Sequence, residues 1–132
     1  MSGRLVYLDS SAFVKLVITE AETAALSAYL RRRSVAVSAT LLRTEALRAA
    51  TRASPAAILA VRRALREIAF LDLDRDLLDQ AGTLAPIGLR SLDAVHVAAA
   101  LSLGDDLDEL VTYDARMAAA ATASGLVVAS PS

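Results

Sequence analysis

The sequence predicts an α/β fold in which helices cover both faces of a central parallel sheet of about five strands. Short apolar runs alternate with longer segments of helical periodicity throughout the 132 residues. Strands separated by helices require crossover connections, and such connections build parallel sheets with helices on both faces. The length suits one domain with a sizeable core, and no repeat or linker interrupts it. A single domain is therefore expected over residues 1–132.

The predicted strands are apolar runs of four to six residues, bounded by residues that favour turns or helix caps. They span residues 4–8, 35–38, 68–73, 109–113 and 126–129. The first of them ends directly before Asp9, and the fourth ends directly before Asp114.

The predicted helices begin at capping residues. Thr19 and Glu22 have the spacing of a capping box. Ser54 is an N-cap followed by Pro55 at the first helical position. Further N-caps are expected at Ser10, Asp74 and Ser91. The helices that follow from these starts span 11–18, 19–33, 39–52, 56–67, 75–85, 91–103 and 115–124.

The composition excludes several classes of protein. No apolar run approaches the roughly 20 residues of a membrane span, and no signal peptide is recognisable, so a cytoplasmic location without a membrane partner is expected. The absence of cysteine excludes disulfides, thiolate zinc sites and cysteine nucleophiles, and the single histidine excludes mechanisms that need two imidazoles. The surplus of apolar residues, including 29 alanines, is expected to cover a subunit or partner interface.

Four acidic residues are expected at one edge of the sheet. Asp9 and Asp114 follow predicted strands, Asp93 lies in the first turn of a helix, and Glu45 lies about one turn into another helix. Ligands of open α/β sheets bind beyond the carboxyl ends of the strands. Each acid alone is explained by a turn, a helix cap, the helix dipole or a surface ion pair. Together they indicate a divalent cation, because hard oxygen ligands suit Mg²⁺ or Mn²⁺.

Four stretches carry a resemblance to a known family: VYLDSSAFVKL, RTEALRA, LRSLDAVHVAAAL and LVTYDARM, in this order and spacing. They resemble the PIN-domain nucleases, in particular the toxins of bacterial VapBC toxin–antitoxin pairs. The resemblance implies a PIN-like three-layer α/β/α fold and a Mg²⁺-dependent endoribonuclease of a type II toxin–antitoxin system. It also implies a homodimer and a cognate VapB-like antitoxin that lies over the groove. The catalytic and metal-binding acids of the family match Asp9, Glu45, Asp93 and Asp114.

The chemistry of phosphodiester hydrolysis agrees with that implication. Without cysteine, and with one histidine, the nucleophile and the charge neutralisation must come from elsewhere, and a carboxylate-held cation supplies both. We expect Asp9, Asp93 and Asp114 to hold the principal Mg²⁺, for which Mn²⁺ can substitute. Glu45 is expected to position the attacking water or to help hold a second ion, and both roles stay open.

Other residues near the acids have weaker signals. Ser10 and Thr112 are candidates for orienting a carboxylate or a metal-bound water, although a helix cap or a turn hydrogen bond is the favoured explanation for both. His96 stands three residues after Asp93 and is expected to be a packed, hydrogen-bonded residue.

Arginine makes up 13 of the 14 basic residues. Arginine suits planar contacts to phosphate, although genome composition also explains the bias, and a net charge of −1 rules out a bulk polycation. Arg43, Arg48 and Arg52 are expected to contact the phosphates of an RNA substrate; a solvated helix face is the alternative.

The same residues disfavour two other functional classes and leave a third open. A phosphoacceptor switch domain needs an acid pair after the first strand and a lysine near the last, yet Asp9 is followed by two serines and Lys15 is the only lysine. An Asp-x-Asp phosphatase fails at Ser11. A catalytically inactive PIN-like partner-binding module is the alternative that stays open, although none of its acids is missing. Binding of Mg²⁺ or Mn²⁺, compared between the native chain and Asp93→Asn, discriminates the two.

Overall fold

A sheet of five parallel strands forms the centre of the computed structural model, which describes residues 4–33 and 35–132. The strands are β1 (Leu5–Leu8), β2 (Val35–Ala39), β3 (Ala69–Leu71), β4 (Leu107–Val111) and β5 (Val128–Ala129). Their order across the sheet is β3-β2-β1-β4-β5, and every neighbouring pair is parallel. The predicted parallel sheet is confirmed.

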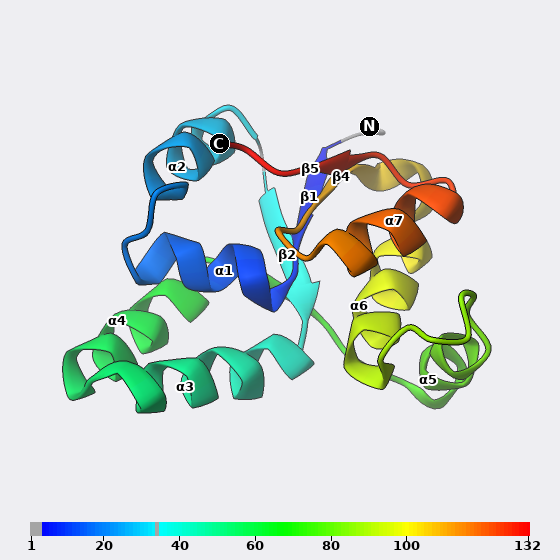
Figure 1. The fold of residues 1–132 in the computed structure, drawn as a ribbon, viewed down its shortest axis with the longest axis horizontal. Coiled ribbons are helices and arrows are strands. Elements are labelled where there is room, and N and C mark those ends of the chain that lie inside the picture. Colours follow the sequence, from blue (N-terminus) through cyan, green and yellow to red (C-terminus); the bar gives the residue numbers. More distant parts are fainter. Residues whose placement is uncertain (1–3, 34) are drawn as a thin grey trace.

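Helices lie on both faces of this sheet. They are α1 (Ser10–Val17), α2 (Thr23–Arg31), α3 (Leu41–Ala53), α4 (Pro55–Leu65), α5 (Arg75–Gly82), α6 (Ser91–Ser102) and α7 (Ala115–Ala123), with a 3-10 helix at Gly104–Asp106. In Figure 1, α1 to α4 lie to the left of the sheet and α5 to α7 to its right. The three-layer α/β/α fold expected from the sequence is confirmed. Within the described residues, no helix is long and apolar enough to cross a membrane.

Alternate side chains of β1 enter the two halves of the core. Val6 and Leu8 pack with Ala12 of α1 and Leu26 of α2, whereas Tyr7 enters the cluster formed around α6. All three strand side chains are fully buried. A strand that is covered on both faces needs a continuous apolar run rather than an alternating one, which explains the composition of this segment.

Helix α6 is the most deeply buried helix of the layer formed by α5, α6 and α7. Its residues 94–100 are all buried, and it packs against α5, α7 and β2. A helix that is apolar nearly all round must lie among neighbours. The first turn of α6, which contains Asp93, leaves this packed environment and reaches the carboxyl edge of the sheet.

Two of the predicted helix caps are correct. The Ser54 hydroxyl accepts a hydrogen bond from the Ala57 N–H at 3.1 Å, and the Asp74 carboxylate accepts one from the Leu77 N–H at 2.9 Å. Each satisfies an N–H that has no partner inside its own helix.

The predicted cap at Ser10 is wrong, because Asp9 takes that position. The Asp9 carboxylate accepts a hydrogen bond from the Ala12 N–H at 2.9 Å, and Ser10 is the first residue of α1. An ionised carboxylate is the stronger acceptor for an N–H at the positive end of a helix. The side chain at the end of β1 is thereby fixed by the helix that follows.

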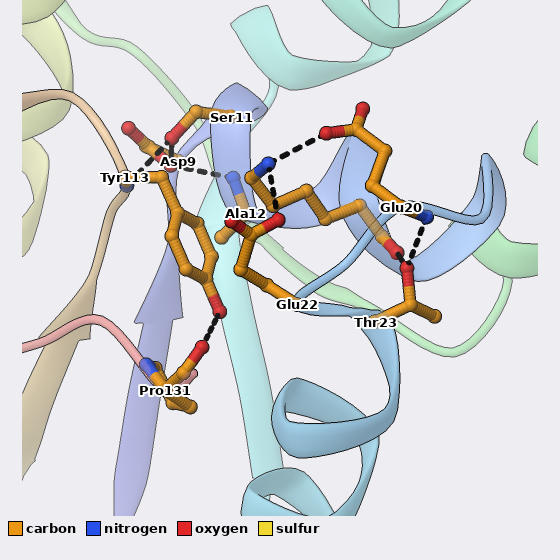
Figure 2. A network of polar contacts seen from close by, with 9 residues as sticks. Asp9, Ser11, Ala12, Glu20, Glu22, Thr23, Tyr113 and Pro131 are labelled. Carbon is orange, nitrogen blue, oxygen red and sulfur yellow. Dashed lines mark hydrogen bonds and ion pairs between the residues drawn. The ribbon is translucent and has the colours of Figure 1, made fainter.

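The capping box at Thr19 and Glu22 is also wrong. Helix α2 begins at Thr23, whose hydroxyl accepts from the Glu20 N–H and donates to the Lys15 carbonyl. The Lys15 ammonium binds the carboxylates of Glu20 and Glu22, at 2.6 and 3.0 Å (Figure 2). Glu22 therefore forms an ion pair with Lys15 instead of the hydrogen bond of a capping box.

Helix α6 begins without the predicted Ser91 cap. Arg90 occupies the N-cap position in an extended conformation, and its side chain makes no cap hydrogen bond. Its carbonyl accepts the first helical N–H, that of Ala94, at 2.9 Å. Ser91 is the first residue of the helix.

Candidate active site

The acidic residues lie where the strand order reverses. Strand β1 has β2 on one side and β4 on the other: the chain runs outward from β1 through β2 to β3 and then crosses to β4 on the opposite side of β1. Asp9 follows β1 and Asp114 follows shortly after β4, at the carboxyl ends of these neighbouring strands. This is the position at which open α/β sheets bind ligands.

Asp9 is the most buried of the four acids, with 1% of its surface exposed. Its Oδ1 accepts hydrogen bonds from the Ser11 hydroxyl at 2.7 Å and the Ala12 N–H at 2.9 Å (Figure 2), and its Oδ2 accepts one from the Thr112 hydroxyl. Burial raises the pKa of Asp9 above its usual value, although these hydrogen bonds favour the ionised form. The carboxylate is rigidly oriented, and its charge is poorly compensated.

Thr112 joins Asp9 to Asp114. The buried Thr112 hydroxyl donates to Asp9 and accepts a hydrogen bond from the Asp114 N–H at 3.1 Å. Asp114 is the N-cap of α7, and its Oδ1 accepts from the N–H groups of Arg116 at 2.9 Å and Met117 at 3.2 Å. The role expected for Thr112 is to orient a carboxylate, and its hydroxyl does hydrogen-bond the carboxylate of Asp9.

Asp93 reaches the same edge from the first turn of α6. Its side chain is 18% exposed, and its Oδ2 lies 3.6 Å from Nε of Arg90. Burial raises the pKa of Asp93, and the negative charge of Asp114 raises it further. The carboxylates of Asp93 and Asp114 are therefore close enough for each to feel the charge of the other.

Glu45 approaches from α3 and is held by two other elements. Its Oε1 lies 2.6 Å from Nε2 of His96, and its Oε2 accepts a longer hydrogen bond, 3.5 Å, from the Ser10 hydroxyl. The negative charge of Glu45 also contributes to the raised pKa of Asp93. The structure thus gathers all four predicted acids at one edge, with Ser10 and Thr112 beside them.

The four carboxylates are suitable ligands for a divalent cation, but they are not arranged in a coordination geometry for one. Within residues 4–33 and 35–132, no three Asp, Glu or His side chains are arranged to hold a metal ion. The oxygens take part in helix caps and side-chain hydrogen bonds instead. Carboxylate oxygens have further lone pairs for an ion, and the raised pKa values of Asp9 and Asp93 mark anionic charge that a cation would neutralise. The residues fit Mg²⁺ by their chemistry, and holding it requires side-chain rotations.

A groove of about 600 Å³ lies beside Glu45. Glu45, Arg48 and Arg52 of α3 line it, together with Ser10 and Lys15 of α1. Two of the three arginines assigned to RNA are therefore next to Glu45.

Arg43 is placed differently. Its guanidinium lies 5.3 Å from the centre of the Phe70 ring, and Arg43 is not among the residues that line the groove. The structure does not bring it together with Arg48 and Arg52.

Two side chains at this site were not singled out by the sequence analysis. Ser11 binds Asp9 through its hydroxyl and accepts a hydrogen bond from the Tyr113 N–H at 2.9 Å (Figure 2). Tyr7 contacts His96 from β1. The two serines after Asp9 are equivalent in sequence, so only the direction of α1 decides which one binds it. The partner of Tyr7 is set by the packing of α6 on the sheet.

Comparison with known proteins identifies the family. The PIN domain model matches residues 6–123. The chain is 49% identical to Ribonuclease VapC46 of Mycobacterium tuberculosis (strain ATCC 25618 / H37Rv) over 127 residues, which cover 96% of this chain and 98% of the relative. It is 37% identical to Ribonuclease VapC47 of Mycobacterium tuberculosis (strain CDC 1551 / Oshkosh), with 96% and 97% covered.

Solved structures share the fold at lower identity. Mycobacterium tuberculosis VapC20, described as a sarcin-ricin loop cleaving toxin, aligns with a TM-score of 0.75 and 18% identity, covering 96% of this chain and 99% of that one. VapBC2 from Rickettsia felis, bound to a DNA fragment from its promoter, aligns with a TM-score of 0.70 and 10% identity, with 97% and 99% covered. The family match and the close relatives give the same result: the chain belongs to the PIN-domain family and is similar to its VapC ribonucleases.

Proposed function

We propose that this protein is the toxin of a type II toxin–antitoxin pair and a Mg²⁺-dependent endoribonuclease. The observation that carries the proposal is the convergence of Asp9, Glu45, Asp93 and Asp114 on one edge of the sheet, where raised pKa values mark uncompensated charge. Relatives named ribonucleases, at up to 49% identity over nearly the whole chain, support it. An inactive partner-binding module is the competing function, and it predicts neither metal binding nor cleavage.

Asp9, Asp93 and Asp114 would hold the principal Mg²⁺. When bound, Mg²⁺ lowers the pKa of a water and neutralises charge on the phosphate. Asp9 enters the reaction already fixed by Ser11 and Thr112, so little conformational entropy is lost when it ligates. Because Asp9 is buried, water screens the attraction of a cation to it less than at an exposed carboxylate.

Glu45 would accept a proton from the attacking water or help hold a second ion. Its Oε1 is bound by His96, which leaves Oε2, with its long bond to Ser10, as the oxygen that can turn toward a water or an ion. Arg48 and Arg52 would bind the phosphates that flank the scissile bond, because they line the groove next to Glu45. Arginine matches the geometry of phosphate through its planar fork of donors.

Cleavage of RNA by the purified chain tests the proposal. We expect no cleavage in EDTA, cleavage after addition of Mg²⁺ or Mn²⁺, and loss of most activity in Asp114→Asn. The matched control is Asp76→Asn, since Asp76 is an exposed acid in the first turn of α5, away from the site. Undiminished cleavage in EDTA contradicts the metal mechanism. Sequencing the 5′ ends of the products identifies the target.

We further propose a homodimer and a VapB-like antitoxin as partners. Structural neighbours include VapBC2 from Rickettsia felis and a toxin-antitoxin complex from Klebsiella pneumoniae. An Arg or Lys of the antitoxin that reaches the acids would compete with Mg²⁺, since both bind carboxylates. Light scattering should give the mass of a dimer at micromolar concentration. Expression of the whole locus should yield a co-purifying small protein that suppresses cleavage, and a strictly monomeric protein without such a partner contradicts this part.

A further inference from the structure

His96, the single histidine of the chain, is fully buried and uses both ring nitrogens. Nδ1 lies 2.7 Å from the Tyr7 hydroxyl, and Nε2 lies 2.6 Å from Oε1 of Glu45. The Tyr7 ring meets the imidazole edge-on, with 5.7 Å between ring centres. The expected packed, hydrogen-bonded histidine is therefore present, but one of its bonds reaches a proposed catalytic acid.

The hydrogen bonds have a defined direction. The Ala39 N–H of β2 donates to the Tyr7 hydroxyl at 3.2 Å, so this hydroxyl oxygen already accepts one hydrogen bond and has its own proton to donate. Nδ1 of His96, 2.7 Å away, is the acceptor that this geometry offers for that proton. Nε2 then carries the imidazole proton and donates it to Glu45.

We propose that His96, held in place by Tyr7, is a positioning residue that fixes the carboxylate of Glu45 at the acid cluster. The inference rests on the proposed function, in which Glu45 acts on the water or on a second ion. By binding Oε1, His96 prevents free rotation of a long side chain and leaves Oε2, which accepts only the 3.5 Å bond from Ser10, to act at the site. These hydrogen bonds form a relay from the Ala39 N–H of β2 through Tyr7 and His96 to Glu45, so the backbone of β2 fixes its starting point.

Arg48 is the obvious competitor for Glu45. It lies three residues further along α3 and lines the same groove, and such a spacing favours an ion pair on a helix surface. Among the described residues, Glu45 is nevertheless bound by His96, at 2.6 Å, and forms no ion pair with Arg48. A chain that lacks the imidazole should release Glu45 to Arg48, which removes the carboxylate from the site and occupies a cation that contacts RNA.

Kinetics of three variants test the inference. We expect His96→Leu to lower kcat about 10- to 100-fold, the usual effect of losing a partner that orients a ligand, with a small change in the KM for RNA. His96→Gln should recover part of the loss, because its amide can still donate to Glu45. Tyr7→Phe should lower kcat less than His96→Leu. Tyr29→Phe is the matched control, since Tyr29 donates to Glu109, away from the acids.

A double variant separates positioning from packing. If His96 acts through Glu45, His96→Leu should cost nothing further in a Glu45→Gln background. Independent, multiplicative losses overturn the inference, as does a His96→Leu protein with native kcat. A native chain that fails to cleave RNA with Mg²⁺ refutes the proposed function instead, so the two failures are distinguishable.

Imidazole ¹⁵N spectra test the relay without any assay of activity. In a tag-free protein the signals come from His96 alone, because the chain has one histidine. We expect an unprotonated Nδ1 and a protonated Nε2 in the native protein. Glu45→Gln should move the Nε2 signal, and Tyr7→Phe should move the Nδ1 signal. A protonated Nδ1, or an Nε2 signal unaffected by Glu45→Gln, overturns the inference.

Discussion

The hydroxyl of Thr112 donates a hydrogen bond to Oδ2 of Asp9 across 103 positions of the sequence. The same hydroxyl accepts the Asp114 N–H, so one buried group connects the ends of β1 and β4 and sets both aspartates. The Ser11 hydroxyl, 3.4 Å from that of Thr112, adds a second link between these strand ends. The edge of the sheet is a polar network in which each acid depends on its neighbours.

Thr112→Val should lower both stability and activity. Valine keeps the shape and removes the hydroxyl, which takes away the donor to Oδ2 of Asp9 and leaves the Asp114 N–H without this acceptor. Such buried losses cost about 1–3 kcal/mol of unfolding free energy, measurable by urea denaturation, and cleavage should fall as well. Thr112→Ser keeps the hydroxyl and should retain most of both. Native activity and stability in Thr112→Val would show that the network is dispensable.

Asp93→Asn should stabilise the metal-free protein at neutral pH. Burial and the charge of Asp114 raise the pKa of Asp93 in the folded state. A carboxyl group with a raised folded pKa penalises folding as pH rises through that pKa, and the penalty is complete above it. The advantage of Asp93→Asn should therefore be present at neutral pH in EDTA and vanish below the pKa of an unfolded aspartate, about 4.

Melting curves across this pH range, recorded for native protein, Asp93→Asn and Asp76→Asn, measure the effect. Asp76 is an exposed acid at the start of α5, so its variant should show no such pH-dependent gain. The lost ion pair with the exposed Arg90, 3.6 Å long, should matter little. A lower melting temperature for Asp93→Asn in EDTA would refute the electrostatic penalty.

Arg48→Gln and Arg52→Gln should each weaken RNA binding and reduce its salt dependence. If each arginine makes one phosphate contact beside Glu45, as proposed, the slope of log K against log salt should fall by about 1. Arg43→Gln should have a smaller effect, because Arg43 lies against Phe70 outside the groove. Arg62→Gln, on α4, is the control.

Fluorescence anisotropy with Asp114→Asn as the background measures binding without cleavage. Equal slopes for all four arginine variants would exclude a role for the groove in RNA binding.

The fold and the location of the acids follow from local signals in the sequence. Apolar runs separated by helices predict parallel strands, and an acid after such a run lies at the carboxyl edge, as Asp9 and Asp114 do. Ser54 and Asp74 cap their helices because each has the required N–H three residues further on. These features depend on a few neighbouring residues.

The remaining features depend on contacts between distant segments. Asp9 rather than Ser10 caps α1, and Lys15 engages the glutamate assigned to a capping box. The bonds from Tyr7 through His96 to Glu45 join β1, α6 and α3, so no local pattern reports them. The strand predicted over 126–129 is present but only two residues long, because its extent is set by its pairing with β4.

Calorimetric titration of Mg²⁺ into metal-free protein tests most directly whether the four acids share a divalent cation. Native protein and the Asp76→Asn control should bind Mg²⁺ with the same affinity. Asp93→Asn should bind at least about 10-fold more weakly, and Mg²⁺ should raise its melting temperature much less than that of the native chain. Equal Mg²⁺ affinity in all three proteins, or no binding to any, would contradict a shared carboxylate site and favour an inactive partner-binding module.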